Sequence, residues 1–284
     1  MVFLTTAVLA AGACSSTDSR IVYKPFEQLE WVERTRSPVA YAMAERHFRF
    51  CAPLRHAVNR AAGAFNTAQT EFEAGEHSDI NRLFRLKSIY ERYRRDLISN
   101  LWEVLFFKPD HRPALLEIVS LLEETWHVQA GEGYGLEIEM ANLVELEKAL
   151  RFSSDFFGRD YEVNYKLGAV LYREGNIIKH IPELASAVNE ASPPTPEERF
   201  LDAKVFLRKC IAVRSMYAEA YQLLAFCLEE EGKDKEAYKF WKLITVIEQA
   251  YEREGADEPG SLTADIYEMA HGKVKEYEKE YGVL

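Results

Sequence analysis

The side chains of this sequence that could do chemistry are its carboxylates, and their spacing matches no catalytic motif. None of the seven histidines belongs to an HExxH pair, and no two of them have metal-ligand spacing on one helix face. Glutamates are dense, as in the run 229–231, but a charge run on an amphipathic helix is usually a solvated face. We therefore expect no catalytic residue, metal or cofactor. The alternative is an enzyme that acts on glycans or peptidoglycan through a carboxylate such as Glu123 or Glu132.

The four cysteines, Cys14, Cys51, Cys210 and Cys227, are too few for a disulfide scaffold and form no CxxC pair. We expect Cys51, Cys210 and Cys227 to be buried free thiols, because a cysteine on an apolar helix face behaves as a small hydrophobic residue. A disulfide between Cys210 and Cys227 is the alternative, since these two residues belong to adjacent helical elements.

The N-terminus has the pattern of an export signal. Residues 1–13 carry no charge, and their apolar stretch is too short to span a bilayer but matches the core of a signal peptide. Small residues at 11–13 precede Cys14, and a serine-rich stretch follows it. This arrangement resembles the lipobox of bacterial lipoproteins, although no lysine or arginine precedes the apolar stretch and Ala11 stands where that family usually has leucine. A plain signal peptide or a buried first helix is the alternative.

The lipobox resemblance implies a fate for the mature chain. In that family the peptide is cut before the cysteine, whose thiol and new amino terminus are acylated. Cys14 would then be the lipidated first residue, and residues 14–24 would form a flexible tether. The protein is therefore expected in the cell envelope, held to a membrane by lipid and facing the periplasm or the cell exterior.

Composition limits the remaining classes. The 284 residues hold 35 Lys and Arg against 46 Asp and Glu, which gives a net charge of −11. No chain-wide basic field is present to offset phosphate repulsion, so we expect no nucleic-acid partner. Fourteen glycines and ten prolines are few for this length, which disfavours a turn-rich all-β fold.

A 3.6-residue apolar period runs through the chain after Arg20, and no segment alternates as a strand does. The pattern predicts an all-α protein. The expected helices span 25–35, 38–52, 54–74, 79–107, 113–128, 135–156, 160–175, 177–190, 196–213, 217–231, 234–253 and 262–281. Gly175 and Gly232 are expected to end helices in left-handed turns. Thr195, Pro196 and Glu198 form an N-terminal capping signal.

The clearest helical pair, residues 218–251, has a repeat pattern. With Ala218 as position 1, Tyr221 is the aromatic residue at position 4 and Trp241 the one at position 24. The small residues at positions 8 and 20 are Ala225 and Ala237, and the glycine at position 15 is Gly232. This resembles the tetratricopeptide (TPR) repeat, a helical hairpin of 34 residues. The small residues let the two helices of a hairpin cross closely, while bulky residues fill the space between hairpins.

The same register extends upstream. Gly168 and Gly175 fit positions 8 and 15 of a preceding unit, and Ala203 and Leu207 fit its positions 20 and 24, with a long insertion between the two halves. A fainter unit follows Lys108. The sequence thus predicts antiparallel helical hairpins in a degenerate TPR-like superhelix, with an N-terminal helical part at 25–107 and repeats with a C-terminal capping helix at 108–284.

In TPR proteins, fixed positions of each first helix line a concave binding surface. The resemblance implies that this groove is formed by Glu162, Tyr165, Tyr172, Arg173, Glu219, Gln222, Phe226, Glu229 and Glu230. The set is acidic and aromatic, and it lacks the Lys, Asn and Arg that bind acidic C-terminal peptides in chaperone-binding TPRs. We expect a protein partner with a basic or apolar surface, and a homo-oligomer is compatible with the same surface.

Charge is unevenly distributed along the chain. Residues 1–100 hold 14 basic and 11 acidic residues, whereas residues 101–284 hold 21 and 35. One hypothesis is that the N-terminal helices face anionic lipid headgroups while the acidic repeats face a partner. The alternative is an ordinary arginine-rich helix face that pairs with glutamates of neighbouring helices.

Taken together, the N-terminal and repeat patterns predict an exported, lipid-anchored, non-enzymatic adaptor. In its architecture the chain is similar to the T-component associated with some tripartite ATP-independent periplasmic (TRAP) transporters. That family has degenerate TPRs and docks a periplasmic solute-binding protein, so the resemblance implies such a protein as the partner.

Overall fold

The computed structural model describes residues 31–75, 79–131, 135–254 and 261–282, and every regular element in these ranges is a helix. The elements are α1 (Trp31–Arg36), α2 (Pro38–Phe50), α3 (Ala52–Glu73), α4 (Ile80–Phe107), α5 (Arg112–Gly131), α6 (Leu136–Phe156), α7 (Tyr161–His180), the 3₁₀ turn η2 (Pro182–Leu184), α8 (Ala185–Val188), α9 (Pro196–Val213), α10 (Ala218–Glu230), α11 (Asp234–Glu254) and α12 (Ser261–Tyr281).

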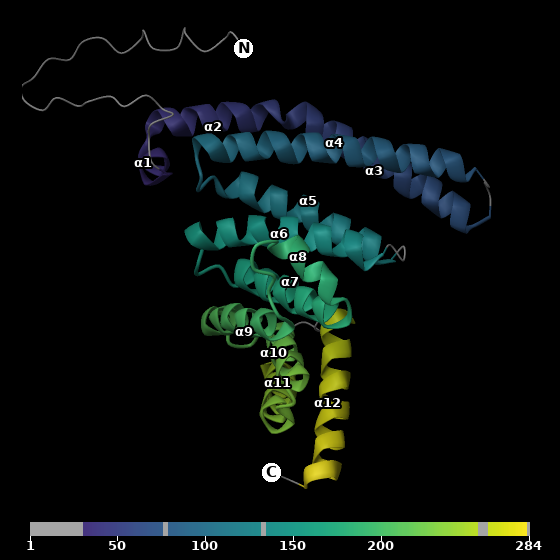
Figure 1. The fold of residues 1–284 in the computed structure, drawn as a ribbon, viewed down its shortest axis with the longest axis vertical. Coiled ribbons are helices and arrows are strands. Elements are labelled where there is room, and N and C mark those ends of the chain that lie inside the picture. The colour runs from purple at the N-terminus through teal and green to yellow at the C-terminus, as the bar shows by residue number, and fades with distance from the viewer. Residues whose placement is uncertain (1–30, 76–78, 132–134, 255–260, 283–284) are drawn as a thin grey trace, which may run out of the picture.

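The helices stack along the long axis of the molecule largely in the order of the chain, except that α8 lies beside α6 and α12 runs along that axis beside α11 (Figure 1). At one end α4 runs beside α2 and α3, and at the other end α10, α11 and α12 pack together. Between these ends, α5 packs on α6, α6 on α7, and α7 on α9. The described chain is therefore all-α, with TPR-like hairpins α5–α6, α7–α9 and α10–α11 after the additional N-terminal helices. This confirms the predicted fold class.

Local signals account for several helix ends. The Thr195 side chain accepts a hydrogen bond from the Glu198 backbone N–H at 3.2 Å, and the Glu198 carboxylate accepts one from the Thr195 N–H at 2.8 Å. This capping box starts α9 where the sequence predicts it. Gly232, with φ of +69°, follows the end of α10. Glycine adopts this left-handed conformation without steric strain because it has no Cβ atom. The prediction that Gly232 ends a helix in a left-handed turn is therefore confirmed.

Gly175 has another role than the predicted one. It does not end a helix, because α7 continues through it to His180, and the expected helix 177–190 is replaced by η2 and α8. A Cβ atom on Gly175 would lie 2.7 Å from the Phe200 ring of α9, and one on Gly168 would lie 2.7 Å from Leu207 Cγ. Both glycines therefore permit the close packing of α7 on α9.

Two clusters of buried apolar residues hold the stack together. The first extends from Ala44 in α2 to Cys227 in α10, and the second joins α10, α11 and α12 around Trp241, which is fully buried. The predicted division at 107/108 lies inside the first cluster. Helices of the N-terminal part and of the first two hairpins thus share one core.

Candidate functional site

The predicted groove lies on α7 and α10, and its aromatic residues contact one another. Tyr172 of α7 stacks on Phe226 of α10 with ring centroids 6.1 Å apart. Tyr165, about two helical turns earlier in α7, makes an edge contact with Tyr217, with ring centroids 5.0 Å apart. Burial raises the pKa of Tyr165 to about 12, and the nearby Glu219 carboxylate adds to the shift. These tyrosines therefore remain neutral hydrogen-bonding groups throughout the physiological range.

Charged members of the predicted groove are held by partners within the chain. The Arg173 guanidinium donates two hydrogen bonds to Glu139 of α6, at 2.6 and 2.9 Å, in a bidentate pair. Glu230 pairs with Lys179 near the end of α7. These contacts stabilise the junctions between successive hairpins, and a ligand would have to break them to use either side chain.

The C-terminal helix α12 covers part of the same face. Glu229 accepts hydrogen bonds from Trp241 Nε1 at 2.7 Å, from the Tyr277 hydroxyl at 2.8 Å and from Lys273 Nζ at 3.2 Å. The Gln222 amide lies 3.5 Å from the Met269 sulfur. Since Lys273, Tyr277 and Met269 all belong to α12, this helix occupies the α10 side of the predicted groove.

Residues of both α7 and α10 remain at least partly open on this face. Glu162 is exposed, and Glu219, Tyr165, Tyr172 and Phe226 are half-buried. The nine predicted residues thus lie on two neighbouring helices, but the tertiary contacts engage Arg173, Gln222, Glu229 and Glu230 internally. The groove as a partner-binding surface stays a prediction.

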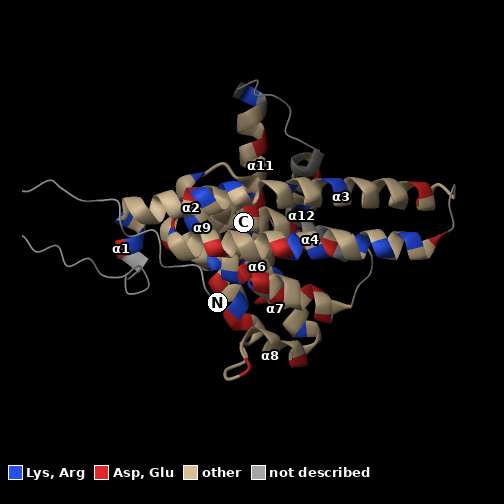
Figure 2. Cartoon of the chain, turned by 90° about the horizontal axis from the view of Figure 1, so that it is seen from above, with Lys and Arg blue, Asp and Glu red and all other residues tan. Residues whose placement is uncertain are grey.

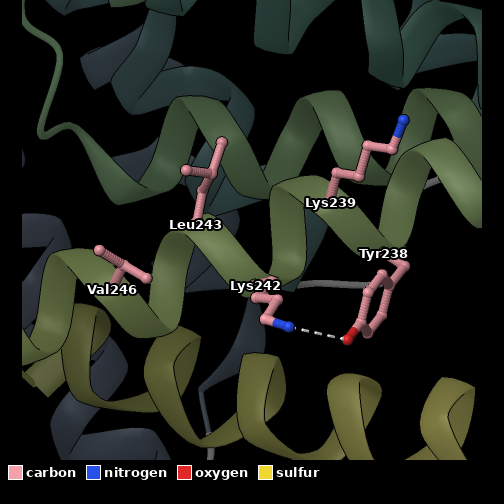
Figure 3. A pocket seen from close by; sticks show the side chains of 5 residues that line it. All are labelled: Tyr238, Lys239, Lys242, Leu243 and Val246. Atoms are coloured by element: carbon pink, nitrogen blue, oxygen red, sulfur yellow. Dashed lines mark hydrogen bonds between the residues drawn. The ribbon is translucent and has the colours of Figure 1, made fainter. Parts of the chain in front are cut away.

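The structure adds a surface that the sequence did not single out, an apolar hollow of about 510 Å³ along α11. The described residues that line it are Tyr238, Lys239, Lys242, Leu243 and Val246, which all belong to α11 (Figure 3). The Leu243 and Val246 side chains are 43% and 53% exposed. The Lys242 ammonium donates to the Tyr238 hydroxyl at 3.3 Å, at one end of the hollow.

A sequence signal for this hollow exists in the spacing of α11. Trp241, Ile244 and Ile247 form its buried face, yet Leu243 and Val246 continue the apolar character around the helix. A surface helix normally shows one apolar stripe with polar residues opposite. The second stripe, at 239, 242, 243 and 246, follows the spacing of one helix face and is the feature that marks an uncovered contact surface.

A charged cleft of about 530 Å³ lies between α6, the start of α9 and the segment before it. Four of the six charged residues that line it pair with one another: Glu147 accepts hydrogen bonds from Arg151 at 2.6 Å and from Arg199 at 2.9 Å, and Arg151 donates to Asp202 at 3.2 Å. These contacts tie α6 to α9, and the charges of the four residues neutralise one another inside the protein.

Behind this cleft lies Glu174 of α7, whose side chain is completely buried. Arg199 approaches it at 3.4 Å, but neither carboxylate oxygen accepts a hydrogen bond in the described part of the chain. Burial raises the pKa of Glu174 to about 8, and the neighbouring Glu147 carboxylate acts in the same direction. At neutral pH the protonated carboxylic acid is therefore the favoured form.

Of the two carboxylates named for the enzyme alternative, the structure describes only Glu123. Glu123 is engaged by Lys166 of α7, and Glu132 lies outside the described residues. Within the ranges that the structure describes, no group of three potential metal-ligating side chains is found. Of the segments predicted from the N-terminus, the signal peptide, the tether and the lipidated Cys14 all lie outside the described residues.

The three cysteines within the described ranges, Cys51, Cys210 and Cys227, are buried and free. This agrees with the expected free thiols and not with the alternative disulfide. Burial raises the pKa of Cys210 and of Cys227 to about 12. In the same ranges, no helix is both long enough and apolar enough to cross a bilayer.

Comparison with known proteins adds little. No family model matches the chain, and no curated protein matches it. Among solved structures, the chain is similar to the crystal structure of MamA, with a TM-score of 0.35 and 18% sequence identity over 72% of this chain and 99% of that one. A likeness at this score supports no statement about function, and the fold class stands on the helices described above.

Proposed function

We propose that this chain is a non-enzymatic adaptor whose helical repeats bind a protein partner, with the hollow on α11 as a principal contact. The observation that carries the proposal is the exposed pair Leu243 and Val246 in a hollow on the outside of the clearest repeat. Apolar side chains exposed on a helix surface lose contact with water when a partner covers them, which favours association. Helical-repeat scaffolds use surfaces of this kind.

The residues around the hollow indicate what the partner offers. Lys239 and Lys242 are exposed beside the apolar walls, so an amphipathic helix with acidic residues flanking its apolar face fits this surface. The predicted groove on α7 and α10 is the other candidate surface. Its open residues are acidic and aromatic, so a partner that also touches Glu162 or Glu219 would present basic or apolar groups there.

The test is capture of a partner from the native envelope, followed by binding assays with purified proteins. The variant L243S/V246S removes the apolar walls of the hollow, and L201S/V205S is a matched control because Leu201 and Val205 are similarly exposed on α9. We expect a stoichiometric partner that the first variant loses and the control retains. Equal binding by both variants would remove the hollow from the proposal, and the absence of any stoichiometric partner would reject the adaptor.

The finer proposal is an exported adaptor anchored by lipid at Cys14. The uncharged apolar start of the chain, the small residues before Cys14 and the serine-rich stretch after it support this. Labelling of cells with a palmitate analogue, compared between the wild type and Cys14→Ser, measures it. Label on the wild type alone would support lipidation, and an unlabelled wild-type chain that stays full length would contradict it.

A periplasmic solute-binding protein of a TRAP-type transporter is the partner that the architectural resemblance favours. Binding to such a protein, purified from the same organism, is the direct measurement. Transporter genes beside the gene for this chain would strengthen the proposal, and their absence would weaken it. The glycan-acting enzyme remains the rival, and a muramidase assay of wild type against Glu123→Gln separates the two: turnover that depends on Glu123 supports the enzyme.

A further inference from the structure

The pair α3–α4 forms an arm whose outer end extends past the other helices in both views (Figures 1 and 2). The first sixteen residues of α4, 80–95, carry six basic residues and one acidic residue in a chain whose net charge is −11. Lysine and arginine residues follow one another along this part of the helix in Figure 2. This first part of α4 is therefore basic, whereas the whole arm, residues 52–107, holds eight basic and seven acidic residues.

Part of this charge is already neutralised. Arg82 forms an ion pair with Glu71 of α3 at 3.1 Å, and Arg85 lies 3.8 Å from Asp79. Arg92 and Arg95 are also exposed, but neither forms an ion pair with another residue that the structure describes. Two exposed guanidinium groups thus remain on α4 with no ion-pair partner among the described residues, and that of Arg92 lies 5.2 Å from the centre of the Tyr93 ring.

Large apolar side chains lie next to these cations. Phe84 is 58% exposed and Ile80 46% exposed on α4, and Phe72 is 37% exposed at the end of α3. Ile80, Phe84, Arg92 and Arg95 are separated by four, eight and three residues, which places them along one face of the helix. The face is apolar toward the outer end of the arm and basic toward the body of the molecule.

We propose that this face of α4 binds the surface of a bilayer that contains anionic lipids. Phe84 and Ile80 would enter the boundary between headgroups and acyl chains, while Arg92 and Arg95 contact lipid phosphate and carboxylate groups. Charge complementarity also orients the molecule. The acidic repeats, with 35 acidic against 21 basic residues over 101–284, are repelled by the same surface and point away from it.

This inference goes beyond partner binding and does not require acylation of Cys14. It concerns peripheral contact, which a basic helix with exposed aromatic residues can make without spanning the bilayer. Double-stranded nucleic acid would also attract the arginines, but it offers no apolar environment for Ile80 and Phe84. A bilayer offers an apolar environment to Ile80 and Phe84 and anionic groups to Arg92 and Arg95.

The experiment uses the full chain carrying Cys14→Ser, so that no acyl chain contributes, without any protein partner. Co-sedimentation with phosphatidylcholine vesicles is measured with and without phosphatidylserine, at low and at high salt. We expect binding only with phosphatidylserine, weakened by salt. Each arginine near such a surface changes partitioning about fivefold, so R92Q/R95Q should bind about 25-fold more weakly.

Matched variants separate the face from general charge and folding. K235Q/K279Q removes the same charge from exposed positions of α11 and α12, and it should bind anionic vesicles like the parent chain. Phe84→Ser should weaken the binding that persists at high salt. Unchanged binding by R92Q/R95Q, equal binding to phosphatidylcholine alone, or preference for a DNA duplex over vesicles would each overturn the proposal. Partner capture through α11 is measured without lipid, so its failure and this one are distinguishable.

Discussion

Replacing Glu174 by glutamine should stabilise the protein, although it removes half of an apparent ion pair. The carboxyl group is completely buried between α7 and α9, Arg199 stands 3.4 Å away, and no described hydrogen bond reaches either oxygen. Glutamine keeps the shape of the protonated acid and cannot ionise. The substitution therefore tests whether this buried group prefers to be neutral, as its surroundings indicate.

The sign follows from proton linkage. The pKa of Glu174 is raised from 4.5 to about 8 in the folded chain, so the folded state binds its proton more tightly than the unfolded state does. The stability that this provides is complete below pH 4.5 and is lost as the pH rises through about 8. A shift of one pKa unit is worth about 1.4 kcal/mol, so the wild type should lose up to roughly 4 to 5 kcal/mol relative to Glu174→Gln across that window.

Urea unfolding followed by circular dichroism, repeated at a series of pH values, gives the free energies of both proteins. We expect the two curves to meet near pH 4.5 and to diverge toward pH 8, with the variant more stable. Glu147→Gln is the control with the opposite sign at neutral pH, because Glu147 accepts hydrogen bonds from two arginines. A Glu174→Gln protein less stable than the wild type at pH 8 would refute the reasoning, as would a difference that does not change with pH.

Three further predictions concern packing, thiols and the C-terminal helix. Gly168→Ala should destabilise the chain by about 1 to 3 kcal/mol in urea unfolding, because the new Cβ would lie 2.7 Å from Leu207 Cγ. The control Gly63→Ala, which has no atom within 4 Å of its Cβ position, should stabilise the chain by up to about 1 kcal/mol. Equal effects of the two substitutions would contradict the close approach of α7 to α9. Cys51, Cys210 and Cys227 should react with a thiol reagent at neutral pH only after unfolding, because they are buried and burial raises their pKa values. Fast reaction in the native state would contradict this, as would unreactive Cys210 and Cys227 after unfolding without reductant, which would indicate a disulfide between them. Glu229→Ala removes the hydrogen bonds from Trp241, Lys273 and Tyr277, so backbone amide hydrogen exchange should accelerate in α12 and keep its wild-type rate in α3. An unchanged exchange rate in α12 would show that these hydrogen bonds do not hold the helix in place.

The periodicity of the chain was enough to predict most of the helices, because an apolar stripe repeating every 3.6 residues can only be buried by a helix packed on a neighbour. The capping box at Thr195 and the left-handed Gly232 were readable for the same reason, since each acts within a few residues of its own position. Gly175 was misread because a glycine that permits a turn and a glycine that permits a close helix contact have the same local sequence. Only the position of Phe200 distinguishes them.

For the candidate site, too, some features follow from the sequence and others only from contacts between distant residues. The sequence by itself determined that the protein is helical, that its repeats are acidic and its N-terminal part basic, and which helix positions carry aromatic and charged residues. The tertiary structure decided which of these side chains remain available, because availability depends on contacts between residues far apart in the chain. Glu229 is engaged by α12, more than forty residues away at Lys273 and Tyr277, whereas the Leu243 side chain is 43% exposed. Spacing within one helix cannot encode either fact.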